Sequence, residues 1–388
     1  MSLRCIDVKY VPLSEYSSVT PKNLLMTMDQ PSFQLQGNLR DSLRGVLASR
    51  RPILSHLNAD TTWLLQLPYP AHALRPPGRS HFNVLLDPWF RGPQSDLARW
   101  FSSQWHVIES SVQTINELNE CLRDCEQIAQ NEHDRASRHA SHVGASKSYI
   151  DAVVVSHEFT DHCNQHTLLE LDPATPIFAT KEAAILIRSW RYFKLVLDTP
   201  PFSADRSDWR DTSLDPLPTW LGISRIANDS DSLYYHSAIM VSFNLNSKSK
   251  KRSSEVSPAA EAVVYTPHGI HAEDLRCLPA ANPPLRTTAL LHGLHDIRIS
   301  AKQLNLGAHN GLKAQRICDA KYWVSTHDEV KKATGLITPF LRRHVLTLKE
   351  ALDEESKWKG GISNSSTLAD LRDVTFAELM SGESLFLV

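Results

Sequence analysis

The segment Asp151–His166, with the sequence DAVVVSHEFTDHCNQH, joins a strand-like apolar run to a cluster of polar side chains. Its apolar part is Ala152–Val155, in which three of the four residues are β-branched and therefore favour a strand. His157, Asp161 and His162 then follow within six positions. A buried strand that ends in a polar loop is where α/β proteins place binding groups, because the strand fixes the loop. The segment therefore predicts an α/β domain with a binding site after this strand.

Two interpretations of the polar loop are open from the residues alone. Asp161 and His162 are neighbours and cannot share a helix face, so in a loop their side chains can diverge around a cavity. Neutral imidazole together with carboxylate is a ligand set suited to zinc or a similar transition metal. In the structural interpretation, Asp161 or Asn164 caps a helix that begins near Gln165.

The hexapeptide HEFTDH at 157–162 resembles the HxHxDH motif of the metallo-β-lactamase superfamily. His157, Asp161 and His162 are in register with that motif, and Phe159 stands where the family has its second histidine. The resemblance implies an α/β fold, a four-layer αββα sandwich, with two metal sites. In the family, the first two histidines and a later one hold one metal, whereas the aspartate, the adjacent histidine and a late histidine hold the other. Phe159 thus removes a ligand from the first site only.

Two later segments repeat the arrangement of an apolar strand followed by a histidine. In EAVVYTPHGIH the run Ala262–Tyr265 leads to His268, and in KYWVSTHDEV the run Tyr322–Val324 leads to His327. The resemblance puts His268 where the family has an aspartate that bridges two metals, and His327 where it has its final ligand. A turn at TPHG and an ordinary polar strand end are the structural alternatives for these two histidines.

Three further residues are weaker candidates for the site. His236 could be a third-histidine ligand, but its apolar surroundings fit an ordinary strand residue better. Asp87 precedes a proline in HFNVLLDPWF, and an Asp-Pro step favours a turn. Cys163 lies beside His162, yet a buried structural thiol is the preferred interpretation.

The remaining pattern predicts one large domain with additions. Residues 1–50 are expected to form an N-terminal extension packed on the main domain, 51–350 the metallo-β-lactamase-like domain, and 351–388 a C-terminal helix and tail. Inserted loops are expected near 126–148 and 246–258. The first contains His133, His139 and His142 among polar residues, which predicts an exposed insertion outside the site, and the second is a basic, serine-rich segment.

Two local elements are predicted with particular clarity. Thr61–Pro70 and His81–Phe90 are rich in β-forming residues and are expected to pair as an antiparallel hairpin. Val112–Ala129 has apolar residues at helical spacing and predicts an amphipathic helix.

The composition restricts the kinds of binding partner and the cellular compartment that we expect for this chain. The chain has 388 residues, 41% of them hydrophobic, and a net charge of −2, so it can bury a large core but lacks the basic excess that general nucleic-acid binding requires. No apolar run approaches the roughly 20 residues of a membrane span. Six scattered cysteines and a start without an apolar signal segment predict a reducing, cytoplasmic setting. The expected partner is a small-molecule substrate.

The predicted function is metal-assisted hydrolysis. The candidate metal ligands are His157, Asp161, His162, His268 and His327, and His157, Asp161 and His268 are also the candidate catalytic residues. A zinc ion with three protein ligands and an open position lowers the pKa of bound water to about 7, which provides hydroxide for attack on an ester, lactone, amide or phosphodiester. Because Phe159 has no lone pair, one ion is expected rather than two. The alternative is a non-catalytic binding or scaffold protein that has lost part of the metal site.

Overall fold

The computed structural model describes residues 7–8, 45, 47, 49–95, 100–130, 148–228, 235–245, 260–360 and 374–388. Three predicted features lie wholly or largely outside these ranges: most of the extension 1–50, the insertion with His133, His139 and His142, and the basic segment 247–258. The expectations for them stay predictions.

The larger of two main sheets has eight strands in the order β1-β19-β2-β3-β4-β6-β7-β8. Its strands are β1 (Asp7–Val8), β2 (Ile53–His56), β3 (Trp63–Pro68), β4 (His81–Leu86), β6 (Ala152–Val155), β7 (Ile177–Ala179), β8 (Val196–Asp198) and β19 (Glu383–Phe386). β3 and β4 pair antiparallel, which confirms the predicted hairpin. The strands β4, β6, β7 and β8 are parallel to one another.

The smaller main sheet has six strands in the order β18-β15-β12-β11-β10-β9. Its strands are β9 (Leu221–Ala227), β10 (Ser237–Phe243), β11 (Ala260–Thr266), β12 (Leu285–His292), β15 (Tyr322–Val324) and β18 (Thr375–Ala377). β9, β10 and β11 pair antiparallel, whereas β11, β12, β15 and β18 are parallel. Each main sheet is therefore mixed.

One apolar core fills the space between the two sheets, and the strands contribute to it with alternate residues. In β6, Ala152 and Val154 belong to this core, whereas Val153 and Val155 face the opposite side. In β11, Val263 belongs to it and Val264 faces away. Successive side chains of a strand point to opposite faces of the sheet. Strands buried on both faces must be apolar throughout, which explains the continuous apolar runs in the sequence.

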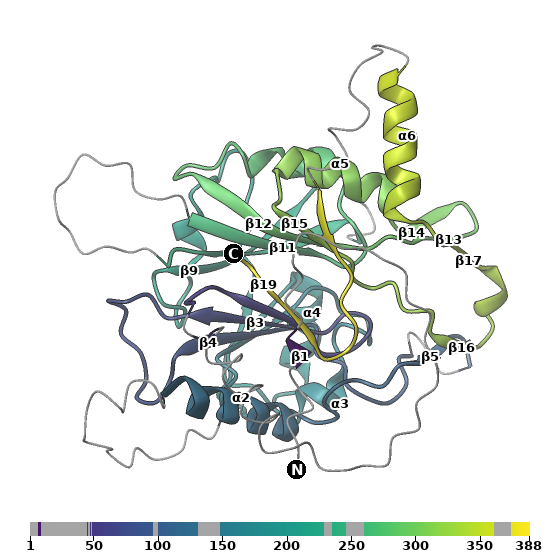
Figure 1. The fold of residues 1–388 in the computed structure, drawn as a ribbon. Helices are drawn as coiled ribbons and strands as arrows, with labels where there is room; N and C mark the ends of the chain where they lie inside the picture. The colour runs from purple at the N-terminus through teal and green to yellow at the C-terminus, as the bar shows by residue number, and fades with distance from the viewer. Residues whose placement is uncertain are drawn as a thin grey trace, which may run out of the picture.

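Helices cover the outer faces of both sheets. Figure 1 shows the two sheets stacked, with α2 (Ile115–Gln130) outside the larger sheet and α5 (Ala308–Cys318) outside the smaller one. α3 (Gln165–Leu168) and α4 (Lys181–Ser189) join α2 in a core on the outer face of the larger sheet, and the 3-10 helix η2 (Ala272–Cys277) joins α5 on the other side. The predicted α/β sandwich with four layers is confirmed. No helix in the described ranges has the length and apolar character that a bilayer crossing requires.

Smaller elements complete the structure. A three-stranded sheet contains β13 (Asp296–Ile299), β14 (Lys302–Asn305) and β17 (Leu341–His344), and a two-stranded ribbon pairs β5 (Ser103–Trp105) with β16 (Lys332–Thr334). Further helices in the described ranges include α6 (Leu348–Gly360), η1 (Trp209–Thr212) and η3 (Thr338–Phe340). The segment expected to be a C-terminal helix and tail contributes β18 to the smaller main sheet and β19 to the larger.

The parallel strands bring the candidate residues to one edge of the sandwich. Asp87 follows β4 and His157 follows β6 in one sheet, and His268 follows β11 and His327 follows β15 in the other. Parallel neighbours have their carboxyl ends at the same edge of a sheet, where α/β proteins bind ligands.

His81, the first residue of β4, is expected to make the stability of the fold depend on pH. Its side chain is buried, and burial lowers its pKa to about 4. Between pH 6.5 and pH 4 the unfolded chain binds a proton at His81 that the folded chain does not bind, so the free energy of unfolding falls as the pH falls. At pH 4.5 this loss amounts to about 2.5 kcal/mol relative to pH 7 or above.

Urea unfolding of wild type and His81→Gln at pH 7 and pH 4.5 measures this contribution. The variant is expected to lose about 2.5 kcal/mol less than wild type between the two pH values. Equal losses in the two proteins would show that His81 does not drive the acid sensitivity.

Candidate metal centre

The five predicted metal ligands meet between the strand ends of the two main sheets. The ring centroids are 4.7 Å apart for His157 and His268, 4.9 Å for His162 and His268, 5.0 Å for His268 and His327, and 5.2 Å for His162 and His327. Asp161 Oδ1 lies 3.7 Å from His162 Nε2. All five side chains belong to residues that are buried.

Their ligand atoms form two overlapping groups. His157, His162 and His268 make one group, and Asp161, His162 and His327 make the other. Within each group every pair of ligand atoms lies within 4.8 Å. His162 belongs to both groups, so the two groups are parts of one polar cluster.

A tight turn after β6 positions Asp161 and His162. The Phe159 carbonyl accepts hydrogen bonds from the backbone N–H groups of His162 and Cys163, and Thr61 Oγ1 donates to the Asp161 carbonyl at 2.7 Å. Asn164 Oδ1 accepts from Thr167 N and caps α3. The helix cap expected in the structural interpretation is therefore Asn164, which leaves the Asp161 side chain directed at the histidines.

Asp87 fixes the orientation of His162. Its carboxylate is fully buried and accepts hydrogen bonds from Ser156 N at 2.7 Å, from Ser156 Oγ, from Tyr265 OH at 2.7 Å and from His162 Nδ1 at 2.7 Å. Since Nδ1 of His162 donates to Asp87, its lone pair is on Nε2. The prediction of a simple turn at Asp87 is corrected: the turn is present, with φ at 43°, but the side chain supports the site.

The other two histidines of the cluster are oriented in the same way. His268 Nδ1 lies 3.0 Å from Asn305 Oδ1, and His327 Nδ1 lies 3.0 Å from Asp60 Oδ1. With the proton on Nδ1, each ring keeps a lone pair on Nε2, the usual arrangement of a histidine that binds metal. The Asp60 carbonyl also accepts from His327 N at 2.8 Å, which helps to hold His327 at a positive φ of 58°.

His157 differs from these three histidines. Its Nε2 donates to the Tyr235 carbonyl at 3.2 Å, and its Nδ1 lies 2.9 Å from Ser156 Oγ. Nε2 is thus engaged, whereas Nδ1 keeps its lone pair, because the Ser156 hydroxyl donates its proton to Asp87. Phe159 stacks near His157, with ring centroids 6.0 Å apart, and also faces Tyr235. At the motif position where the family has a histidine, this chain therefore has Phe159, which packs with other aromatic rings.

Two charged residues that the sequence analysis did not include complete the cluster. Lys331 Nζ lies 2.6 Å from Asp60 Oδ2 and 3.0 Å from Asp161 Oδ2, and it sits 5.1 Å from the centre of the Trp89 ring. Lys331 comes from the segment before β16, and Asp60 from the turn between β2 and β3. Neither follows an apolar strand in a recognised motif, so only the tertiary fold brings them to the site.

The electrostatics of the cluster give most of its groups, but not His162, the protonation state that metal binding requires. Burial lowers the pKa of His157, His268 and His327, so these rings are neutral near pH 7. Burial acts to raise the pKa of Asp161, but the attraction of Lys331, His162 and His327 outweighs it and holds the pKa below its usual range. Burial lowers the pKa of His162, whereas Asp161 and Asp87 raise it and prevail, so without metal the ring favours a proton on Nε2 that a bound cation would displace. Metal binding needs neutral imidazole and ionised carboxylate.

Several buried atoms at the centre fit a metal that would bind them. Within the part of the chain that the structure describes, Asp161 Oδ1, His162 Nε2 and His268 Nε2 have no hydrogen-bond partner. Burying unpaired polar atoms is unfavourable unless something binds them. Imidazole nitrogens together with a carboxylate oxygen are a donor set suited to zinc or a similar transition metal.

Other polar residues considered in the sequence lie outside the two groups of ligand atoms. His236 is buried and contacts the His268 carbonyl at 3.3 Å through Nδ1, so it supports the backbone of His268. Cys163 packs in the core beneath α3, as expected for a structural thiol.

Comparison with known proteins gives a loose structural similarity. No protein-family model and no curated protein matches the chain. A possible metal-dependent hydrolase from Veillonella parvula DSM 2008 has a TM-score of 0.48 at 11% identity, over 87% of this chain and 99% of that chain. An isothiocyanate hydrolase from Delia radicum gut bacteria has a TM-score of 0.47 at 12% identity, over 86% and 98%. The metallo-beta-lactamase fold protein YhfI from Bacillus subtilis has a TM-score of 0.40 at 10% identity, over 86% and 99%. These TM-scores are below 0.5, so we base the function on the geometry of the site.

Asp87→Asn is expected to weaken metal binding about 10- to 100-fold, because partners of a ligating histidine contribute to affinity on that scale. The amide keeps the shape of the carboxylate but loses its charge beside His162. Tyr265→Phe is the control, since it removes a different donor to Asp87 and leaves the bond to His162 in place. Competition with a chromogenic zinc chelator measures both affinities; equal affinity of Asp87→Asn and wild type would contradict the assigned role.

Proposed function

We propose that the protein is a metal-dependent hydrolase whose single cation is held by Asp161, His162 and His327, with His268 beside it as a fourth ligand or as a polariser of the substrate. The observation that carries the proposal is the convergence of three buried atoms without hydrogen-bond partners among the described residues, Asp161 Oδ1, His162 Nε2 and His268 Nε2. The Nδ1 atoms of His162, His268 and His327 are already held by acceptors. Such pre-oriented imidazoles are costly in a core and are explained by a cation that binds them.

One cation is proposed because both candidate groups depend on the same lone pair. His162 belongs to each group, and its Nδ1 donates to Asp87, so only Nε2 can bind metal. A single nitrogen lone pair binds a single cation. Phe159 adds to this restriction, because it offers no lone pair where a second site would need one.

The residues around the cation have distinct proposed roles. When bound, zinc or a similar metal supplies Lewis acidity, activating water and polarising the substrate. Asp161 provides negative charge to the centre through Oδ1. His157 is neutral beside the cluster, and we assign it to proton transfer: its ring would take up the proton released by the attacking water and then give a proton to the leaving group. Phe159 and Tyr235 form an apolar side that limits the access of water.

The substrate class follows from this chemistry. We propose a small molecule with an ester, lactone, amide or phosphodiester bond, each of which is open to attack by activated water. We also propose that the chain is a divergent member of the metallo-β-lactamase superfamily, on the basis of HEFTDH and the four-layer architecture. The free thiols of Cys163, Cys277 and Cys318 support a reducing, cytoplasmic compartment.

Metal content and hydrolysis together test the proposal. Protein purified without chelator is expected to contain about one equivalent of metal by elemental analysis. It should hydrolyse at least one substrate in a panel of chromogenic esters, lactones, amides and phosphodiesters. Dialysis against chelator should remove the activity, and readdition of the metal should restore it.

The outcome also separates the enzyme from the alternative, a scaffold that kept the sandwich. Protein with almost no metal that does not take up added zinc or manganese would reject the hydrolase and favour the scaffold. About two equivalents of metal held equally tightly would agree with a metalloprotein, but they would reject the proposal that the centre holds one cation.

A further inference from the structure

We propose that Lys331 is a built-in counter-ion that takes the place of a second metal at this centre, holding Asp161 so that only one of its oxygens can bind metal. The inference rests on the proposed metal centre and specifies how this chain restricts it. Lys331 is a positioning residue in this scheme, because it acts through Asp161.

The contacts of Lys331 are those of a cation enclosed by ligands. Its ammonium lies 2.6 Å from Asp60 Oδ2, 3.0 Å from Asp161 Oδ2 and 3.4 Å from Gln94 Oε1, and it faces the Trp89 ring. Only 4% of its side chain is exposed. Two carboxylates, a neutral amide oxygen and an aromatic face thus surround one buried positive charge.

The charge balance explains why a cation is needed at this point. Asp60 and Asp161 are both buried, and a buried carboxylate is stable only when a nearby charge or hydrogen bonds compensate it. His327 satisfies Oδ1 of Asp60 through a hydrogen bond, which leaves Oδ2 of that residue to Lys331. The ammonium therefore allows the two carboxylates to coexist before any metal is bound.

The same contact determines how Asp161 can bind metal. Oδ2 of Asp161 is engaged by Lys331, whereas Oδ1 has no hydrogen-bond partner in the described ranges and lies 3.7 Å from His162 Nε2. Asp161 can therefore bind metal through Oδ1 only. A second cation between Asp60 and Asp161 would lie next to the Lys331 ammonium. Two neighbouring positive charges repel each other strongly in a buried site.

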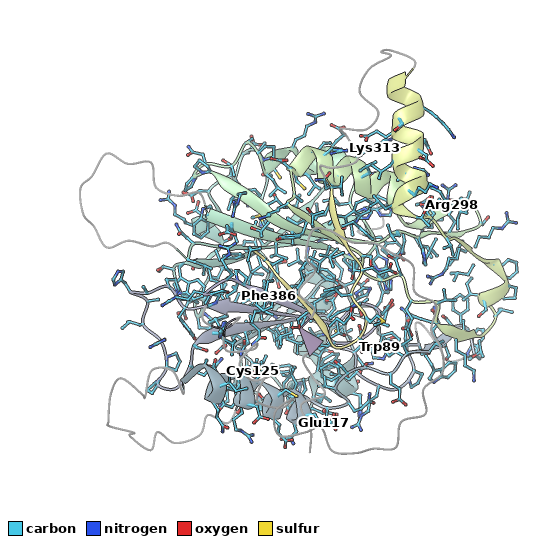
Figure 2. The ribbon with its side chains drawn as sticks, viewed as in Figure 1. Trp89, Glu117, Cys125, Arg298, Lys313 and Phe386 are labelled. Atoms are coloured by element: carbon cyan, nitrogen blue, oxygen red, sulfur yellow. The ribbon has the colours of Figure 1, made fainter. Side chains whose placement is uncertain are left out.

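Lys331→Met tests the inference, because methionine has a similar length and no charge. Lys313→Met is the matched control, since Lys313 is exposed and projects from α5 on the outer layer (Figure 2). Each full-length protein is dialysed against zinc chloride, and the ratio of zinc to protein is measured. The melting temperature is then recorded with chelator and with zinc.

Wild type and the Lys313 variant are expected to bind about one zinc, and Lys331→Met about two. Without metal, Lys331→Met should melt about 5 to 10 °C below wild type, because two buried carboxylates lose their counter-ion, and zinc should restore most of this loss. A ratio that stays at one in Lys331→Met would overturn the inference while leaving the metal centre intact. A ratio near zero in wild type would reject the proposed function itself.

A second variant keeps the test decisive if Lys331→Met does not fold. Lys331→Met combined with Asp60→Asn removes one positive and one negative charge together, so it is expected to fold and to bind about one zinc. Failure of this charge-balanced variant to fold would show that Lys331 acts through packing, which would also overturn the inference.

Discussion

His162→Ala is expected to lower the affinity for zinc by more than about 100-fold and to abolish hydrolysis. The loss exceeds that of an outer partner such as Asp87, because His162 supplies the one ligand atom that both groups share. Alanine leaves Asp87 with its other donors, Ser156 and Tyr265, so the fold should survive. Elemental analysis after dialysis, with circular dichroism as a folding control, measures the effect.

His157→Ala and Asp161→Ala give the matched comparison. Nε2 of His157 donates to the Tyr235 carbonyl, and His157 lies outside the group that contains Asp161 and His327, so its removal should only weaken metal binding. Asp161→Ala removes the one carboxylate oxygen directed at His162 and should abolish it. If Asp161→Ala kept its metal while His157→Ala lost it, the ligands would be wrongly assigned.

Arg79→Met is expected to lower the free energy of unfolding by about 3–5 kcal/mol, the cost of leaving buried charges without a partner. Arg79 is almost fully buried and pairs with Asp151, and its Nε lies 3.7 Å from Glu126. It also donates to the Tyr149 carbonyl at 2.9 Å. Methionine fills a similar volume but leaves both carboxylates without a positive partner, with only hydrogen bonds from Ser80, His81 and Asn83 to stabilise them.

Arg188→Met is the control for this prediction. Arg188 also pairs with a carboxylate, Asp198, at 2.7 Å, but the two side chains are 44% and 51% exposed. Exposed pairs contribute about 0–1 kcal/mol, because water solvates both charges. Urea unfolding should therefore separate the two arginine variants by several kcal/mol, and similar losses would show that burial is not the deciding factor.

The sequence was sufficient to predict the part of the site that depends on strands. His157, His268 and His327 each follow an apolar run, and the carboxyl ends of parallel strands meet at one edge. Asp161 and His162 could be added because a motif of known spacing contains them. The continuous apolar runs of β6 and β11 likewise make these buried strands recognisable in the amino-acid sequence.

The rest of the cluster depends on contacts that no local pattern encodes. Asp60 reaches His327 across 267 positions of sequence, and Lys331 reaches Asp161 across 170. Asn305 comes from the end of β14, in a sheet that the sequence did not suggest. Charged residues in turns are common, so their burial against a partner is visible only once the sheets are packed.

The position of β19 has a consequence for how the chain folds. β19 lies between β1 and β2, and the Arg51 side chain beside it donates to the Leu387 carbonyl, 336 positions away. Closing so long a loop is entropically costly, and contacts of this kind slow folding. Until residues 383–386 leave the ribosome, β2 is an open sheet edge that can pair with another chain. Synthesis of this protein should therefore include a period in which a chaperone, or a slow rate of production, protects the growing chain from aggregation.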